Sequence, residues 1–368
     1  YGSRGANGVV LITTKKGKAG KTAFSINANT GMSNVSHFVD LLNTDDYLAL
    51  RRKAFANNPA AVPSAFDADL TWDPKAYTNF PEFLLGNTAK TYDITSSISG
   101  GDARTNFYLS GTFHKETNIF PGEQSYNRGG AHLSVNHSSQ DQRFNLSISS
   151  IYSADKNDIS ITDLGTYAYN LPPHYPLYNP DGSLYWSQGF NNPLGFLNQT
   201  NDARGSNFLT NLNLRYNILK GLDFKTSVGY SKTDMRTTAV RPLSSLNTSG
   251  STPRTTGSVN ESYVYTNNYI FEPQLTYKTQ IWKGNLEALL GGSWQFKQSK
   301  QPYNVNATDF LSDEFLSNIG SAATRNITSS SSEFKYASVF GRLNYNVLSR
   351  YIANLSFRRD GSSRFGPE

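Results

Sequence analysis

The chain has no cysteine among its 368 residues, and this absence excludes disulfide bonds, thiolate catalysis and cysteine metal sites together. It also lacks any stretch near the ~18 consecutive apolar residues that a membrane-spanning helix requires. Charged residues are sparse, at 17% of the sequence, and the formal net charge of +6 is spread along the chain. The only dense basic cluster runs from Lys15 to Lys21, which is more typical of a solvated linker between strands than of a nucleic-acid-binding surface.

The sequence offers no arrangement of side chains suited to catalysis or to metal binding. Histidine is scattered, and the closest pair, His132 and His137, has a spacing that places the two rings on opposite faces of one strand. Acidic residues fall mainly at turn positions, where a carboxylate caps the backbone. Examples are Asp102, Asp141, Asp181 and Asp202. We therefore predict a protein that is not an enzyme and that carries no metal and no cofactor.

Two glycine patterns resemble nucleotide-binding loops only in part. Gly20-Lys21-Thr22 ends like a phosphate-binding loop, but Lys15 stands where that motif has its first glycine. A strand pattern follows, instead of the helix whose N-terminus would hold the phosphate. The glycines at the start of the chain precede a strand, whereas a dinucleotide-binding fingerprint follows one.

Aromatic residues are abundant, with 22 Tyr, 22 Phe and 4 Trp making up 13% of the chain. This share is high beside a modest aliphatic content, and it suits the aromatic girdles of an outer-membrane barrel. From about residue 92 onward, apolar and polar residues alternate with the period of a β-strand. Phe107, Leu109 and Phe113 share one face, for example, while Ser110 and Thr112 share the other. Alternation of this kind is compatible with a β-sandwich as well as with a barrel.

The connections between these strands distinguish the two folds, because they alternate between short and long. The short ones are Gly100–Thr105, Ser138–Arg143, Leu219–Asp223, Ile281–Asn285 and Asn346–Arg350. The long ones are Met32–Lys90, Thr117–Asn127, Asp158–Arg204, Thr237–Asn260 and Gln301–Glu333. Tight turns at one rim and large loops at the other are typical of a transmembrane barrel, with its turns in the periplasm and its loops outside the cell. We predict an all-β fold with about eleven antiparallel strands, each long enough to cross a membrane.

One segment departs from the strand pattern. Between Asn43 and Asn57, Thr44 is placed to cap a helix, and Asp45 and Asp46 suit its first turn. Apolar and long side chains then recur at helical spacing. We predict one helix there, inside the first long loop.

The opening residues, from Tyr1 to Gly17, combine glycines at a spacing of three with an apolar β-branched run from Val9 to Ile12. This segment resembles the signature that closes the plug domain in the SusC/RagA family of TonB-dependent outer-membrane receptors. The signature residues are Gly2, Arg4, Gly5, Asn7 and Gly8. Further points of resemblance are the helix around Tyr47–Phe55, the Ser99–Gly101 turn with the strand Phe107–Gly111 after it, and the closing segment Arg358–Gly366.

The resemblance implies the end of a plug domain in residues 1–20 and the first half of a barrel in residues 21–368. The family closes its barrel with about twenty-two strands, so an odd number of strands with an unpaired last edge implies a fragment. Such receptors import glycans, peptides or similar nutrients across the outer membrane of Bacteroidota. A SusD-like surface lipoprotein covers the barrel, and the TonB–ExbB–ExbD complex pulls on the plug. Arg4 is then expected to pair with an acidic group of the plug or of the barrel wall.

The loop from Tyr167 to Phe190 is the most suggestive candidate for ligand or partner contact, because aromatic residues and prolines are concentrated in it. Asn179-Pro180-Asp181-Gly182 predicts a tight turn, hence a hairpin inside the loop. The aromatic side chains either pack the loop upon itself or form a platform for a sugar, a peptide or a partner protein. The candidates for that platform are Tyr175, Tyr178, Tyr185 and Trp186.

Two other functions remain open from the sequence. A passive porin would have a similar barrel without a folded plug. A soluble β-sandwich, either a carbohydrate-binding module or a glycosidase, would show the same alternation but would bury its apolar faces between two sheets.

Overall fold

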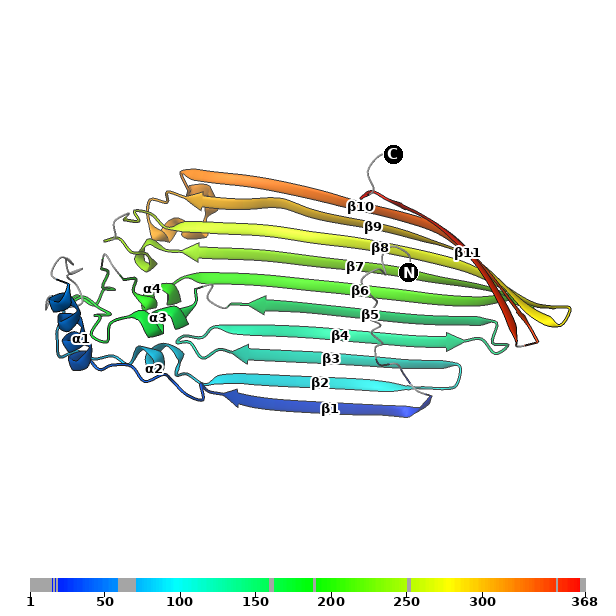
Figure 1. Cartoon of the computed structure of the whole chain (residues 1–368), viewed down its shortest axis with the longest axis horizontal. Coiled ribbons are helices and arrows are strands. Elements are labelled where there is room, and N and C mark those ends of the chain that lie inside the picture. The colour runs from blue at the N-terminus through cyan, green and yellow to red at the C-terminus, as the bar shows by residue number, and fades with distance from the viewer. Residues whose placement is uncertain are drawn as a thin grey trace.

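The structure is a computed structural model, and it describes residues 15, 17, 19–58, 71–158, 162–187, 190–249, 253–348 and 350–364. These residues form one sheet of eleven strands in which every strand pairs with its neighbours in sequence, in the order β1 to β11. All ten pairings are antiparallel. Figure 1 shows the strands side by side along the length of the molecule, with the helices gathered at one end. The predicted all-β fold and the strand number are confirmed.

Strands β6 to β10 are longer than β1 to β5, and β11 is the shortest. Their bounds are β1 Gly20–Ser33, β2 Ala89–Gly101, β3 Thr105–Thr117, β4 Ser125–Ser138, β5 Phe144–Asn157, β6 Thr200–Leu219, β7 Leu222–Arg241, β8 Ser258–Ile281, β9 Gly284–Thr308, β10 Thr324–Val347 and β11 Tyr351–Ser362. Each exceeds the ~9–11 residues that a tilted strand needs to cross a bilayer. The later strands therefore extend well beyond a membrane at the loop end.

The pairing register places apolar side chains opposite one another on one face of the sheet. One row crosses six strands: Val135, Ile148, Leu212, Val228, Phe271 and Trp294. This face is not covered, since Trp294 is 48% exposed and Phe271 is 42% exposed. The neighbouring row on the opposite face is polar and contains Asn136, Ser147, Asn213, Ser227 and Glu272.

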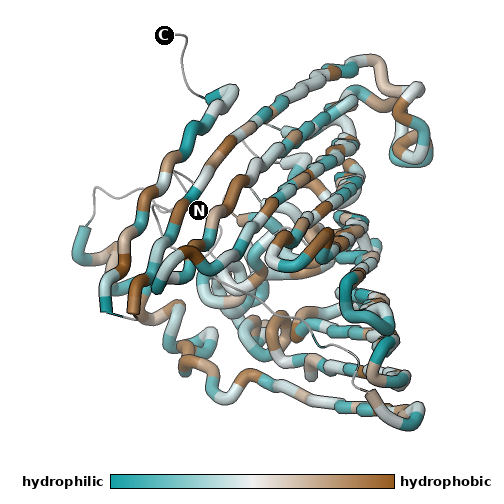
Figure 2. The backbone as a smooth tube through the Cα atoms, turned by 90° about the vertical axis from the view of Figure 1, so that its right-hand side faces the viewer, coloured by the Kyte–Doolittle hydropathy of each residue, from teal (hydrophilic) through white to brown (hydrophobic). Residues whose placement is uncertain are grey.

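Figure 2 shows the strands following one curved wall, with hydrophobic and hydrophilic positions alternating along them. Among the described residues there is no second sheet against which the apolar face could pack. The buried hydrophobic clusters lie elsewhere, at the loop end of the strands. A single layer with an exposed apolar face is the arrangement of a membrane barrel wall and not of a sandwich.

The connections at the two ends of the strands differ as predicted. The turns from β2 to β3, β4 to β5, β6 to β7, β8 to β9 and β10 to β11 are short, and they lie together at the end opposite the helices (Figure 1). The long loops contain α1 Thr44–Asn57, α2 Phe80–Leu85, α3 Leu164–Asn170, α4 Pro193–Leu197, η2 Leu243–Ser245, η3 Asp313–Ser317 and η4 Ile319–Ser321. Within the described ranges, none of the helices has the length and apolarity required to cross a bilayer.

Several local predictions need correction. The helix predicted from Asn43 to Asn57 is present, but Asn43 and not Thr44 is its N-cap: the Asn43 side chain accepts a hydrogen bond from the Asp46 backbone N–H at 2.9 Å. Thr44 is buried and donates its hydroxyl to the Ala76 carbonyl at 2.6 Å. Asp202 was expected in a turn but lies inside β6. There its carboxylate forms an ion pair with the Arg204 guanidinium at 2.8 Å. The short helices α2, α3 and α4 were not predicted, since each is too brief to show a helical period.

Candidate functional site

The loop between β5 and β6 is held by a compact aromatic cluster. The buried members of the cluster are Trp72, Phe80, Leu84, Leu85, Ala168, Leu171 and Tyr175. Trp72 comes from the β1–β2 loop, and its indole N–H donates to the Tyr185 hydroxyl at 2.9 Å. Tyr175 is 2% exposed and donates its own hydroxyl to the Tyr185 carbonyl at 3.1 Å. Burial raises the pKa of Tyr175 above its usual value, so its hydroxyl stays protonated and continues to donate.

The predicted hairpin inside this loop is present. Tyr178 and Leu184 form an antiparallel bridge on either side of the Asn179–Gly182 turn. The Asp181 carboxylate accepts hydrogen bonds from the hydroxyl and the backbone N–H of Ser183, at 2.6 and 2.9 Å. These bonds lower the pKa of Asp181, since they favour its charged form. Gly182 has φ +83°, a conformation that suits glycine.

A buried asparagine joins this hairpin to α4. Asn192 is 0% exposed, and its amide donates to the carbonyls of Leu177 and Tyr185 at 2.6 and 3.0 Å. Its carbonyl oxygen accepts from the backbone N–H of Leu194 at 3.0 Å and so caps α4. Our sequence analysis missed Asn192, although an asparagine directly before a proline and an apolar run is a recognisable helix start.

Trp186 lies where three segments meet. An added Cβ on Gly195, in α4, would stand 2.5 Å from the Trp186 ring and 2.8 Å from the Ser245 carbonyl of η2. The indole therefore packs closely over a position that only glycine allows. This contact fixes the ring plane of Trp186 relative to α4 and η2.

Hydrogen bonds connect the loop between β5 and β6 to the two loops beside it. The Asn247 amide, in the β7–β8 loop, donates to the Ser187 carbonyl at 2.8 Å. The Asp313 carboxylate, in the β9–β10 loop, accepts from the backbone N–H groups of Leu243 and Ser244 at 2.7 and 3.1 Å. Three long loops thus form one connected structure beyond the ends of the strands.

These three loops line an open cavity of about 1020 Å³, which we call the loop cavity. Its lining includes Tyr178, Asn179, Leu184, Trp186, Leu194, Asn198, Leu243, Thr248, Ser249, Phe310, Leu311 and Asp313. Tyr178 is 56% exposed, so its ring is available to a ligand. Of the four aromatic candidates from the sequence, Tyr178 and Trp186 line this cavity, whereas Tyr175 and Tyr185 belong to the aromatic cluster.

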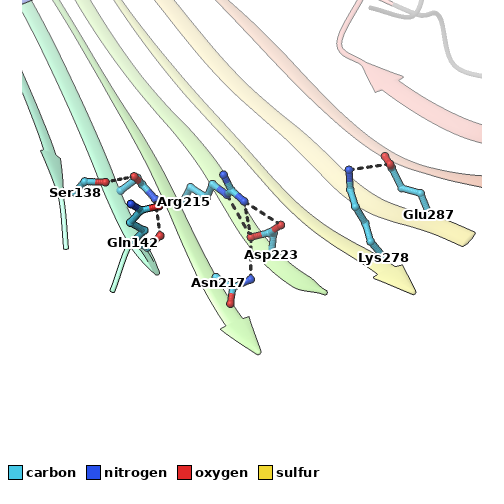
Figure 3. A network of polar contacts seen from close by, with 8 residues as sticks. Ser138, Gln142, Arg215, Asn217, Asp223, Lys278 and Glu287 are labelled. Carbon is cyan, nitrogen blue, oxygen red and sulfur yellow. Dashed lines mark hydrogen bonds and ion pairs between the residues drawn. The ribbon is translucent and has the colours of Figure 1, made fainter. Parts of the chain in front are cut away.

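A second cavity, of about 570 Å³, lies at the opposite end of the sheet. It is lined by polar and charged side chains, among them Arg104, His137, Arg215, Lys225 and Glu272. Polar contacts follow the ends of the strands here, as Figure 3 shows. Arg215 pairs with Asp223 at 3.2 Å, Asn217 donates to the same carboxylate at 3.3 Å, and Lys278 pairs with Glu287 at 3.0 Å.

The remaining sequence candidates are distributed as follows. Gly2, Arg4, Gly5, Asn7 and Gly8 lie outside the described residues. The carboxylates of Asp102 and Asp141 accept backbone N–H groups within their turns, as predicted. A search of the described residues finds no group of three or more His, Cys, Asp or Glu side chains able to hold a metal ion.

Comparison with known proteins gives a consistent set of relatives. No family model matches the chain. TonB-dependent receptor P26 of Formosa agariphila is 30% identical over 393 residues, covering 100% of this chain and 37% of the relative. TonB-dependent receptor P3 of the same species is 28% identical, covering 99% of this chain and 36% of the relative. TonB-dependent receptor SusC of Bacteroides thetaiotaomicron is 25% identical, covering 100% of this chain and 38% of the relative.

Two solved structures share the fold along the whole chain. The RagAB peptide transporter matches with a TM-score of 0.76 and 21% identity, covering 100% of this chain and 45% of that one. The RagAB peptide importer in its closed-closed state matches with a TM-score of 0.75 and 22% identity, at the same coverage. The chain thus spans less than half the length of the relatives it matches.

Proposed function

Because this chain is of the SusC/RagA type of TonB-dependent outer-membrane receptor, we propose that the receptor containing it imports a nutrient across the outer membrane. The nutrient is a glycan oligosaccharide or a peptide. The observation that carries this proposal is the single curved sheet, with an exposed apolar face, a polar opposite face and connected loops around a cavity at one end. The apolar face meets lipid, and the polar face lines the path that the nutrient follows.

The proposal places the loop cavity outside the cell and the short turns in the periplasm. A nutrient then meets the loops first, and Tyr178 and Trp186 are the aromatic side chains exposed to it. Peptide is one class in the proposal because the RagAB structures, which share this fold, are described as a peptide transporter. The charged cavity at the turn end, with Arg215 and Lys225, lies on the polar face of the wall.

A SusD-like surface lipoprotein is the proposed partner at the loop end. Large apolar side chains are exposed on several of these loops, notably Leu311 at 92%, Leu50 at 56% and Tyr77 at 55%. Exposed apolar groups of this size are a common feature of protein–protein contact surfaces.

Energy for import is proposed to come from the TonB–ExbB–ExbD complex through the plug domain. Residues 1–20 are proposed to end that plug, with Gly2, Arg4, Gly5, Asn7 and Gly8 as its signature. The glycines allow a tight path of the chain, and Arg4 forms an ion pair with the plug or the barrel wall.

An Arg4→Ala receptor is expected to assemble less efficiently or to transport more slowly, and normal assembly with normal transport would contradict this role.

The test of the whole proposal compares uptake in three strains: wild type, a strain lacking the receptor gene, and a strain lacking TonB. Candidate labelled oligosaccharides and peptides are supplied one at a time. We expect uptake of at least one of them to be lost in both deletion strains, because active import needs the receptor and its energy source. Uptake that needs the receptor but persists without TonB, together with ligand-independent conductance of the purified protein, would instead support the passive porin.

A further inference from the structure

Resting on the import function proposed above, the geometry points to an uncharged oligosaccharide as the ligand of the loop cavity. Tyr178 and Trp186 form the surface on which its sugar rings lie. The import proposal allows three chemical classes of ligand: neutral glycans, acidic glycans and peptides. Of these we select the neutral glycans. Three features of the cavity favour this ligand: its size, the charge of its lining and the fixed position of the Trp186 ring.

The size of the cavity favours a chain of several units. At about 1020 Å³ it lies at the upper end of the ~300–1,000 Å³ range of small-molecule sites. A single sugar or amino acid would leave most of this volume to water. A short oligomer would fill it and would contact all three loops at once.

The charge of the lining excludes ligands that need a counter-ion. Asp313 is the single charged side chain among the described lining residues, and both of its carboxylate oxygens already accept backbone N–H groups. No Lys or Arg lines the described part of the cavity to bind a sulfate, a uronate or the C-terminus of a peptide. Moving a charged group from water into such a site without a partner is costly.

The remaining lining residues match a neutral sugar. The ring of Tyr178 is half exposed, and the ring of Trp186 is half buried against Gly195. Exposed amide and hydroxyl groups of Asn198, Thr248 and Ser249 lie around the same space. Sugar rings offer C–H faces to aromatic rings and hydroxyl groups to amides and alcohols, a combination of apolar surface and a few polar groups that is typical of ligand sites.

The backbone that carries Tyr178 and the ring of Trp186 are both held by contacts within the loops. The bridge between Tyr178 and Leu184 fixes the hairpin, Asn192 fixes the hairpin to α4, and Gly195 fixes Trp186. A ligand that binds here therefore does not have to order the loops, and less of its binding free energy is lost. The bridge occupies one backbone edge at Tyr178 and one at Leu184. A sugar, unlike an extended peptide, needs no strand edge in order to bind.

Isothermal titration calorimetry of the purified full-length receptor, with each probe added in turn, tests this inference. The probes are neutral hexasaccharides of α-1,4-glucan, β-1,3-glucan, β-1,4-xylan and β-1,4-mannan, a hexamer of a polyuronate, and a pool of tryptic peptides. We expect at least one neutral hexasaccharide to bind. We expect Tyr178→Ala and Trp186→Ala each to raise its Kd by about tenfold or more, because each removes one aromatic surface.

Two further variants control for folding and for the hydroxyl group. Tyr169→Ala removes an exposed tyrosine from α3 in the same loop, outside the described lining of the cavity, and should leave Kd within twofold. Tyr178→Phe keeps the ring and should retain most of the affinity. The thermal transition of every variant is measured, so that a loss of binding is interpreted only where the protein stays folded.

The outcomes separate this inference from the import function. Tyr178-dependent binding of the polyuronate or of peptides, or failure of every neutral probe to bind, would overturn the assignment of the cavity to neutral glycans. If the polyuronate or a peptide binds in a Tyr178-dependent way, TonB-dependent uptake of that ligand would still support the import function. Loss of TonB-dependent uptake for all ligands, with neutral sugar binding intact, would overturn import alone.

Discussion

Single side chains decide how the loop between β5 and β6 is held. Asn192 makes three hydrogen bonds from a fully buried amide, to groups that belong to the hairpin and to α4. Tyr175 and Tyr185, by contrast, pack in the aromatic cluster and are not among the described lining residues of the cavity. At this scale the loop is a small folded unit with its own core.

Replacing Asn192 with alanine should loosen this unit. The substitution removes three hydrogen bonds: the Leu177 and Tyr185 carbonyls each keep one other donor, but the Leu194 N–H loses its Asn192 acceptor. A buried group left unsatisfied in this way costs about 1–3 kcal/mol. We expect faster hydrogen exchange of the Tyr185 and Leu194 amides, with no change in the strands. Asn191→Ala, at the adjacent exposed position, is the control, and equal exchange in the two variants would argue against a central role for Asn192.

Acid should open the hairpin turn. Hydrogen bonds from Ser183 hold the pKa of Asp181 below its ordinary value of 3.8. A group whose pKa is depressed on folding contributes stability above its unfolded pKa, and this contribution is lost as pH falls through the folded pKa. Exchange of the Ser183 amide, corrected for its intrinsic rate, should therefore be protected near neutral pH and lose this protection only as the pH falls below 3.8, the ordinary pKa of the group. Asp181→Asn should abolish this pH dependence, and a dependence that survives the substitution would exclude Asp181 as its source.

Among the structural elements, the short turns are where the backbone tolerates least change. The turn between β6 and β7 has Gly221 at φ +85°, and an added Cβ there would stand 2.2 Å from the Lys278 carbonyl of the adjacent strand β8. The turn must be this tight because β6 and β7 pair almost to their ends, from Thr200 with Val240 to Leu219 with Leu222. The glycine thus allows the neighbouring strands to stay in register.

Gly221→Ala should impair assembly of the sheet. A left-handed conformation costs about 1–2 kcal/mol for a residue with a side chain, and the clash with Lys278 adds to this cost. We expect less heat-modifiable folded receptor in outer membranes, as measured by gel mobility before and after boiling. Gly129→Ala in β4 is the matched control, since its added Cβ would meet no atom within 4 Å. Comparable folded amounts for the two variants would show that the turn accommodates the change.

The ion pairs at the turn end contribute little by comparison. Lys278, Glu287 and Arg342 form one group, with N···O distances of 3.0 and 3.3 Å, but both cations are more than half exposed. Exposed pairs of this kind contribute about 0–1 kcal/mol. Their position is more informative than their energy. They lie on the polar face beside the turns, and so identify the face of the sheet that contacts water.

For the molecule as a whole, the important asymmetry is between the two faces of the sheet. Val228 lies on the exposed apolar face and Ser227 on the polar face, although the two are adjacent in sequence. A soluble protein would have to cover the apolar face with a second layer, and the described residues contain none. Lipid is the solvent that matches this face.

Introducing a charge should distinguish the two faces. Val228→Lys should destabilise the membrane-inserted receptor by about 2–4 kcal/mol, the cost of a cation near the middle of the bilayer on the lipid-facing side of a barrel. Ser227→Lys, one residue away, should have little effect, because its side chain points to the polar side. The measurement is reversible unfolding of the full receptor in bilayers, followed by tryptophan fluorescence. Equal destabilisation by both variants would contradict the assignment of the faces.

The sequence by itself determined the strands, their faces and the ends at which turns and loops lie, because a period of two and the glycine and asparagine of tight turns are local signals. It also indicated the turn at Asn179–Gly182 and the helix after Asn43. It missed α2, α3 and α4, since their positions depend on packing against residues far away in the chain. For the same reason, only the tertiary structure decided which aromatic residues of the loop form its core and which line the cavity. Tyr175 and Tyr178 are three residues apart and equally aromatic, but one is buried against Trp72 from another loop and the other is exposed.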